Sequence, residues 1–199
     1  MKYLHPDILD GGLLAIKNTA VKMLLIKSYA FGDSYAAVNA AKLAEVNTTS
    51  TDFIITSSGN NRVLTTASGK SATASANSTQ YESSTATGGT TTTLADTTKT
   101  WTTNAHAGRA VRITAGAGAG QYGRIVSNTA TGLTLQTAWA IAPNGTSVYK
   151  IVDDLHFAFT DGSGRVLWVE NENSDQTVTS GNTIDFPSMV TTAFQPAAV

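Results

Sequence analysis

Short strand-like runs separated by turn residues extend from Gly88 to Ile151, and they constrain the fold of this chain more than any other feature. The runs are rich in Thr, Val, Ile and aromatic residues, and none of them repeats its apolar residues with a helical period. The sequence on either side differs in composition, and the two flanks could continue one another if this block were removed. The pattern therefore predicts a small β-module inserted into a host domain.

The composition indicates a surface built for contact with other proteins. Only 14% of the 199 residues are charged, whereas about 25% is typical of globular proteins. Thr, Ser, Ala, Gly and Asn replace the missing charges. Thr favours strands because its branched Cβ fits a pleated surface, and its hydroxyl keeps an exposed face polar without charge. An uncharged exterior suits packing against neighbours, because burying an ion costs desolvation.

Charge and cysteine content exclude several function classes. The net charge of −1 leaves no basic excess of the kind that binds nucleic acid. The chain has no cysteine, so thiolate chemistry, Cys-bearing zinc sites and disulfides are excluded. The first twelve residues lack the apolar core of a secretion signal, and no apolar run approaches membrane-spanning length. We therefore expect a soluble product of the cytoplasm, with no nucleic-acid or membrane partner.

The flanks predict the elements of the host domain. Pro6 opens a possible short helix over 6–19, in which Gly11 and Gly12 weaken the middle. The Ala-rich stretch after Gly32 fits either a helix or extended chain. The strands expected before the insert are 21–29, a hairpin of 51–56 and 62–66, and an exposed strand over 70–76.

A composition change at 77–89 is typical of a linker, and the host sequence returns at 152–154. The strongest hairpin pattern follows, with strands 155–160 and 165–169 around the turn 161–164. Further strands are expected at 176–179, at 183–186 and in the final segment from Ser188. The predicted fold class is all-β: a β-sandwich or barrel-like host domain with a short N-terminal helical or extended segment, plus an inserted small β-barrel or sandwich. The boundaries are 1–79 and 153–199 for the host and 80–152 for the insert.

Residues 118–123 match the G-x-G-x-x-G pattern of dinucleotide sites. That pattern binds a pyrophosphate only where its glycines turn a strand into a helix. The residues that follow favour strands, so we interpret the segment as a loop between two strands and expect no cofactor.

No group of residues indicates catalysis or metal binding. His5, His106 and His156 lack the paired spacing of zinc ligands, and His156 is expected at the edge of a core or on the surface. Asp153 with Asp154, and Glu170 with Glu172, could chelate calcium or act as an acid–base pair. Both pairs adjoin strand ends, where we expect solvated carboxylates with structural roles. The predicted catalytic and metal-binding sets are therefore empty.

Trp101 and Trp139 each follow a Thr-rich, Leu-centred run, and we expect both to fill the core of the insert. An alternative use of the aromatic residues is as exposed stacking surfaces for a glycan, and the candidates for that role are Tyr122, Trp139 and Tyr149.

The two flanks, residues 1–38 and 154–190, resemble small virion proteins that tailed bacteriophages encode near their capsid genes. The insert, over 95–143, is similar to a β-module found in many phage structural proteins. These resemblances cover most of the chain and imply a virion component made in the host cytoplasm. They carry no motif with assigned functional residues.

The resemblance implies, as the leading hypothesis, a non-enzymatic decoration (cement) protein on the outer capsid surface. Its partners would be the major capsid protein and its own copies, as a homotrimer or homodimer. The host domain with its N-terminal segment would face the capsid and the insert would project outward. The alternative is a tail, fibre or head-spike component that contacts a host-surface glycan. A third hypothesis, a glycan hydrolase acting through Glu170 and Glu172, lacks a converging set of catalytic groups.

Overall fold

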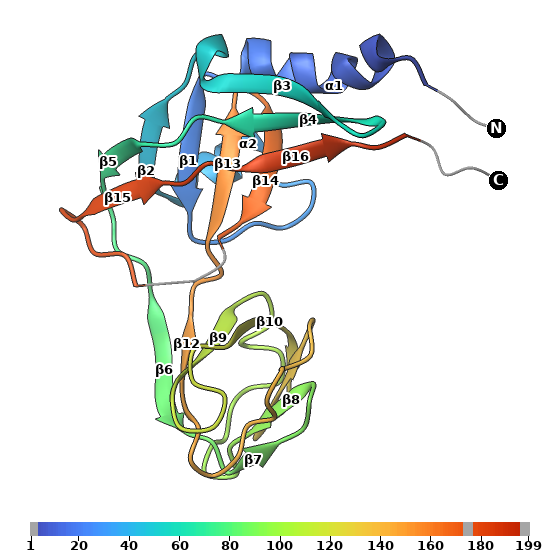
Figure 1. Ribbon diagram of the computed structural model, residues 1–199. Helices are drawn as coiled ribbons and strands as arrows, with labels where there is room; N and C mark the ends of the chain where they lie inside the picture. The colour runs from blue at the N-terminus through green and yellow to red at the C-terminus, as the bar shows by residue number, and fades with distance from the viewer. Residues whose placement is uncertain (1–3, 173–176, 196–199) are drawn as a thin grey trace.

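The computed structural model describes residues 4–172 and 177–195, which form two units joined by two neighbouring strands (Figure 1). The first, the host unit, contains two helices and nine of the strands. Its elements are α1 (Pro6–Thr19), β1 (Lys22–Ile26), α2 (Tyr35–Ala40), β2 (Lys42–Asn47), the 3-10 helix η1 (Ser50–Asp52), β3 (Phe53–Ser58), β4 (Asn61–Thr66), β5 (Lys70–Thr73), β13 (His156–Thr160), β14 (Val166–Asn171), β15 (Thr183–Phe186) and β16 (Val190–Ala193). The second, the module, contains β6 (Gln80–Thr85), β7 (Gly88–Gly89), β8 (Thr93–Ala95), β9 (Ala110–Ala115), β10 (Tyr122–Asn128), β11 (Gly132–Leu135) and β12 (Val148–Val152).

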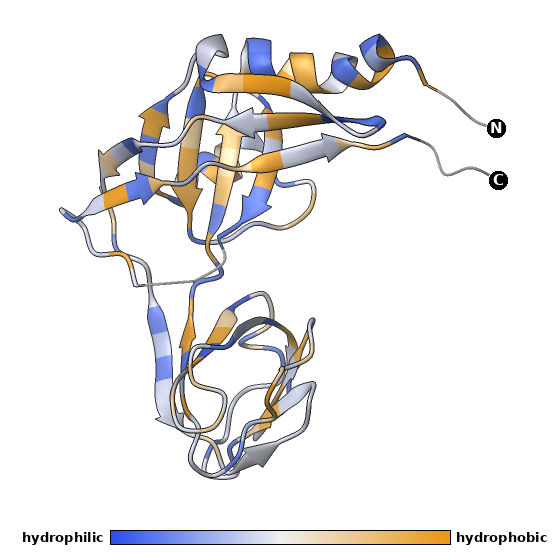
Figure 2. Cartoon of the chain, viewed as in Figure 1, coloured by the Kyte–Doolittle hydropathy of each residue, from blue (hydrophilic) through white to orange (hydrophobic). Residues whose placement is uncertain are grey.

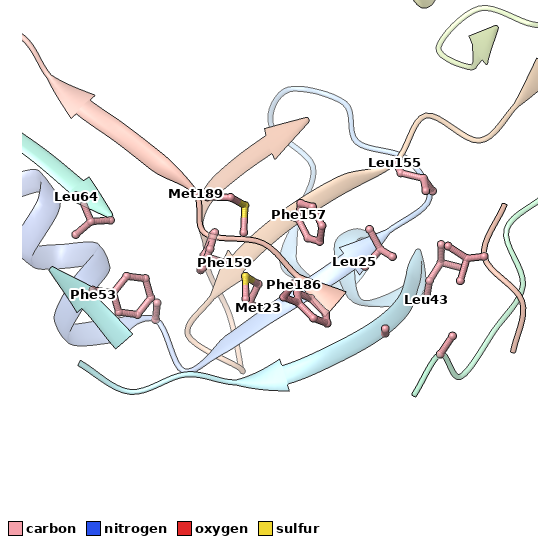
Figure 3. Close-up of a cluster of buried hydrophobic side chains, with 14 of the residues drawn as sticks. Met23, Leu25, Leu43, Phe53, Leu64, Leu155, Phe157, Phe159, Phe186 and Met189 are labelled. Atoms are coloured by element: carbon pink, nitrogen blue, oxygen red, sulfur yellow. The ribbon is translucent and has the colours of Figure 1, made fainter. Parts of the chain in front are cut away.

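The host unit packs one larger sheet against two smaller ones. The larger is antiparallel with the order β14-β13-β1-β2, and the smaller sheets are β16-β4-β3 and β15-β5. Between them lies a core of aliphatic, aromatic and methionine side chains (Figure 3), which includes Met23, Phe53, Phe157, Phe159 and Phe186. The predicted all-β class is confirmed, and the predicted strands at 21–29, 155–160 and 183–186 contain β1, β13 and β15.

Strand β1 is buried on both of its faces, which explains its continuous apolar sequence. Successive side chains of a strand point to opposite faces of the sheet. Met23 and Leu25 enter the main core, whereas Leu24 and Ile26 pack against Val38 of α2 on the other side. The Ala-rich stretch after Gly32, which the sequence allows to be helix or extended chain, contains the helix α2. This helix covers the side of β1 and β13 that points away from the main core.

Helix α1 spans the range that the sequence predicts. The ring of His5 accepts a hydrogen bond from the Asp7 amide, and Pro6 occupies the first turn, where no amide donor is needed. Leu9 and Leu13 are buried against the host sheets. The helix is also held by an ion pair in which Arg62 Nε lies 2.6 Å from Asp10 Oδ1.

The module is a small closed barrel. Its antiparallel strands follow the order β6-β12-β9-β10-β11-β8-β7. The continuous segment 80–89 stands at both ends of this order, since β6 pairs with β12 and β7 pairs with β8. Backbone hydrogen bonds from Ala86 to Ser147 and from Thr87 to Ala95 mark the point where the segment passes from one partner to the other. A closed barrel removes the unpaired edges that an open sheet would leave.

Two of the predictions of secondary structure are wrong. The predicted linker over 77–89 contains β6 and β7. Figure 2 shows why the β6 segment has the composition of a linker. The strand is largely hydrophilic, and it lies beside the hydrophobic β12. The strand predicted over 176–179 is absent from 177–179, and Gln176 lies outside the described residues. The domain boundaries at 79/80 and 152/153 stay predictions.

Candidate functional site

A cleft of about 630 Å³ lies where the module meets the host unit. Tyr122, Arg124 and Trp139 line it from the module. The host unit lines it with Tyr29 and His156, together with residues of β14. Pockets of this size hold small ligands in many proteins, and this is the place where two sequence-predicted site residues come together.

The three predicted aromatic residues have different environments. Tyr122 is 37% exposed, but Trp139 is 4% exposed and Tyr149 is 0% exposed. The interpretation of Trp139 and Tyr149 as exposed stacking surfaces is therefore wrong. Both belong to the core of the barrel, and Trp101 packs against that core. This agrees with the prediction that Trp101 and Trp139 fill the core of the insert. These rings are largely hydrophobic, so burying them is favourable where each polar atom has a hydrogen-bond partner.

Tyr149 finds its partner in a buried carboxylate. Its hydroxyl donates to Asp96 Oδ2 at 2.8 Å, and Ser84 Oγ donates to the same oxygen at 2.8 Å. Burial, aided by the Asp96 charge, raises the pKa of Tyr149 far above its usual value. Burial acts to raise the pKa of Asp96 as well, but hydrogen bonds from Thr98, Ser84 and Tyr149 together hold it below its usual range. This group is a structural anchor of the barrel.

Arg124, which lines the cleft, connects the module to the host unit. Its Nη1 donates to Asp154 Oδ2 at 2.8 Å, and its Nη2 donates to the backbone oxygen of Tyr29 at 3.4 Å. The Asp154 side chain is 3% exposed and that of Arg124 is 35% exposed. The carboxylate of Asp154 is thus buried, and leaving it without a partner would lower the stability of the fold.

His156 is the second ionisable group beside Asp154. Its Nδ1 lies 2.9 Å from the Asp154 backbone oxygen, and its Nε2 lies 3.8 Å from Asp154 Oδ2. Burial lowers the pKa of His156, against the opposing attraction of the Asp154 charge. Burial likewise raises the pKa of Asp154, although His156 and Arg124 oppose the shift. The prediction that places His156 at the edge of a core agrees with its position.

Asp153 joins the two strands that lead into the module. It accepts hydrogen bonds from the Thr79 amide at 2.6 Å and from the Tyr81 hydroxyl at 2.8 Å. Burial and the Asp153 carboxylate raise the pKa of Tyr81, and the guanidinium of Arg109 lies 3.4 Å from the centre of the Tyr81 ring. The expectation that Asp153 and Asp154 are solvated is therefore wrong: they are 4% and 3% exposed and each has a partner.

The remaining candidate ligands lie apart. His5 caps α1, His106 packs edge-on against Trp101 in the module, and His156 lies at the junction. Glu170 is exposed on β14, directly opposite Phe157. Within residues 4–172 and 177–195, no three His, Asp or Glu side chains come together as a metal site would require.

The glycine-rich segment connects β9 and β10, as predicted, and no helix follows it. Gly116 has a φ of 77°, and a Cβ there would overlap the carbonyl oxygen of Thr146. Gly116 therefore allows a close approach between two loops of the barrel. Gly118 and Gly120 of the pattern also have positive φ, which glycine adopts without strain in a turn.

Two exposed surfaces of the host unit, the first apolar and the second uncharged, are not indicated by the patterns described above. The first, which we call the end patch, consists of Leu4, Ile8 and Phe194, whose exposed fractions are 38%, 65% and 70%. The second, the outer face, is the solvent side of the sheet β16-β4-β3. Its members are Ile54, Thr56, Ser58, Asn61, Val63, Thr65, Val190 and Thr192.

The signal for the outer face was present in the sequence. Ile54 and Ile55 are neighbours in β3, so they must point to opposite faces of the sheet. Ile55 packs against the main core, and Ile54 is 58% exposed. A pair of large apolar neighbours in a strand with one solvated face therefore predicts an apolar residue on the outside.

Searches of protein-family models, curated proteins and solved structures returned no match to this chain. None of the helices in the described part of the chain combines the length and the apolar character that crossing a bilayer requires.

Proposed function

We propose that this chain is a non-enzymatic structural protein of a bacteriophage virion, which decorates the outer capsid surface and stabilises contacts between capsid subunits. The observation that carries the proposal is the position of the end patch. Leu4, Ile8 and Phe194 are exposed on the host unit, where the two ends of the described chain meet, and the module lies at the opposite end of the molecule (Figure 1).

This arrangement gives the two units separate tasks. We infer a contact with another protein from these three large apolar side chains, which are exposed near the two ends of the described chain. The end patch would bind capsid subunits, and the module would project from the particle. A protein that binds only the assembled shell stabilises that shell by mass action. The low charge of the chain supports such a role, because few ions would lose their hydration in the contact.

Binding of the purified chain to capsids that lack it tests the proposal. Co-sedimentation should show saturable binding of the unaltered protein, at hundreds of copies per particle. The variant Ile8→Asp should bind at least about tenfold more weakly, because a carboxylate would be buried in the apolar contact. The matched control is Ile141→Asp in the module, whose side chain is 58% exposed against 65% for Ile8. Equal loss of binding in both variants, or tracing of the chain to a tail, would contradict the proposal.

One observation favours the alternative, contact with a host-surface glycan. Tyr122 lines the junction cleft with part of its ring exposed, and Trp139 forms part of the same wall. An exposed aromatic ring can stack against the apolar face of a sugar. In that case Tyr122→Ala would reduce retention of the protein on host polysaccharide, and a virion would contain a dozen copies or fewer. A retention equal to that of the unaltered protein would remove this alternative.

A further inference from the structure

The outer face of the host unit is an uncharged surface made by three antiparallel strands. Ile54 of β3 is paired with Thr65 of β4, and Thr65 is paired with Val190 of β16. Paired residues of neighbouring strands point to the same side of a sheet. These three side chains therefore form one row across the sheet, with Ile54 58% and Val190 54% exposed at its two ends.

The next rows repeat this chemistry. Val63 of β4 is paired with Thr56 on one side and with Thr192 on the other. Asn61 and Ser58 form the last pair, beside the β3–β4 turn. All eight side chains of the outer face are aliphatic, hydroxyl or amide groups. The nearest charged strand residue, Arg62, points to the opposite side of the sheet, where it pairs with Asp10 of α1.

The two edge strands of this sheet contain neither charged residues nor proline, although the ammonium of Lys17 in α1 donates to the Phe53 backbone oxygen at 2.8 Å. Natural edge strands often contain charged residues or proline, which prevent association. β3 and β16 are the edge strands here, and their sequences FIITSS and VTTA contain neither. The face itself has no charged side chain that would oppose the approach of a second sheet.

We propose that the outer face is an interface between two copies of this chain. In a two-fold symmetric interface the same surface meets itself, so any charge near the axis faces an identical charge. A face without charges meets no such repulsion from its own copy. It also offers no cation to a nucleic acid or to an acidic partner. The methyl groups of Ile, Val and Thr in the two faces would pack at the usual distance of about 10 Å between sheets.

The size of the face determines how tight this contact is. Six residues along a strand and three strands across span about 20 Å by 14 Å, or on the order of 300 Å². Stable interfaces bury about 800 Å² from each partner. The dimer should therefore be weak and reversible in solution, and it should strengthen where copies are held side by side. The interface does not depend on the proposed function, because it requires only this chain.

Analytical ultracentrifugation of the full chain, at concentrations from about 0.01 to 1 mM, tests the proposal in the range expected for a small interface. The unaltered protein should show a reversible monomer–dimer equilibrium. Ile54→Asp and Val190→Asp, on different strands, should each raise the dissociation constant at least about tenfold, because each would bury an unpaired carboxylate in the contact. The control Ile141→Asp introduces the same change at a module residue that, like Ile54, is 58% exposed, and it should leave the equilibrium unchanged.

Circular dichroism and thermal unfolding would confirm that each variant is folded. A chain that stays monomeric up to about 1 mM would overturn the proposal, because its association free energy would then be negligible. So would a dimer that Ile54→Asp and Val190→Asp leave intact. Loss of capsid binding in Ile54→Asp, combined with a monomeric unaltered protein, would assign the face to a capsid subunit and equally exclude the second copy. Loss of capsid binding in Ile8→Asp, by contrast, reports only on the end patch.

Discussion

Leu4 and Gln195 exchange two hydrogen bonds although 191 residues separate them along the chain. The Leu4 amide donates to Gln195 Oε1 at 3.0 Å, and Gln195 Nε2 donates to the Leu4 backbone oxygen at 2.7 Å. The Gln195 amide also donates to the side-chain oxygen of Asn61, in the β3–β4 hairpin, at 2.9 Å. A single glutamine thus links the segment before α1, the end of the described chain and a hairpin.

The variant Gln195→Ala should loosen this junction with little effect on the rest of the fold. It removes two solvent-exposed hydrogen bonds, which together contribute about 1 kcal/mol to the free energy of unfolding. The amide of Leu4 should then exchange with solvent faster, whereas buried amides of β1 should keep their protection. Hydrogen exchange followed by NMR measures both. An unchanged Leu4 exchange rate would show that the side-chain bonds do not hold the two ends together.

Excision of the module should leave a folded host unit. Gln80 and Val152 are paired in register, and the Asp153 amide donates to the Thr79 backbone oxygen at 3.1 Å. Residues paired across antiparallel strands are about 5 Å apart between Cα atoms, so Thr79 can be joined to Asp153 through one or two glycines. The shortened chain should unfold in one cooperative transition. Loss of that transition in a denaturant titration would contradict the predicted boundaries.

Arg124→Ala should destabilise the chain through the carboxylate that it leaves behind. Removing one partner of a buried ion pair costs about 3–5 kcal/mol, and we expect about 2–4 kcal/mol here, because the Arg124 side chain is 35% exposed. Urea unfolding measures the change. Arg165→Ala breaks an ion pair with Asp161 in which the arginine is 63% exposed, and this control should change stability much less. Equal effects would mean that Asp154 is not held by Arg124.

Tyr149→Phe should cost more stability than Tyr35→Phe. Tyr149 donates to the buried carboxylate of Asp96, whereas Tyr35 donates to the neutral backbone oxygen of Gly162 at 2.7 Å. Hydrogen bonds to charged groups contribute about 1.5–3 kcal/mol, and neutral ones about 0.5–1.5 kcal/mol. Thermal and urea unfolding of the two variants compare them directly. The reverse order would indicate that Ser84 and Thr98 alone satisfy Asp96.

Stability should fall in acid through Asp161, in the β13–β14 turn. Hydrogen bonds from the Arg165 side chain, together with backbone amides of Arg165, Gly164 and Ser163, hold the pKa of Asp161 far below its usual value. Because the pKa is lower in the folded state, this stabilisation is complete above the unfolded value, near pH 4, and is lost as the pH falls further. Asp161→Asn should therefore be less stable than the unaltered protein at pH 7, with a smaller difference at pH 2. A constant difference between pH 7 and pH 2 would contradict this assignment.

Local patterns predicted the parts of the fold that local physics decides. The turn at 161–164 and the turn around Gly59 each join two strands of an antiparallel pair, as expected. Gly59 and Gly162 both have positive φ, which glycine adopts without strain. Helix α1 begins at Pro6, where proline lacks only a donor that the first turn does not use.

Features that depend on distant residues could not be predicted from local patterns. β6 contains mainly polar residues, and only its partner β12 makes it a strand. The sequence around Tyr149 does not indicate whether its ring faces solvent or the core, because its partner Asp96 is 53 residues away. Arg124 and His156 both line the junction cleft, and their spacing along the chain does not indicate that they share a site.

The pairing of β6 with β12 has a mechanical consequence. Both strands run between the host unit and the module, so a pull on the module stretches the two backbones together and does not slide one past the other. Their shared ladder of hydrogen bonds is spared under such tension. The load passes into the host unit at two points, through the chain before Thr79 and through β13, whose register with β1 is long and buried. The module is thus held to the host unit by two strands that share the load.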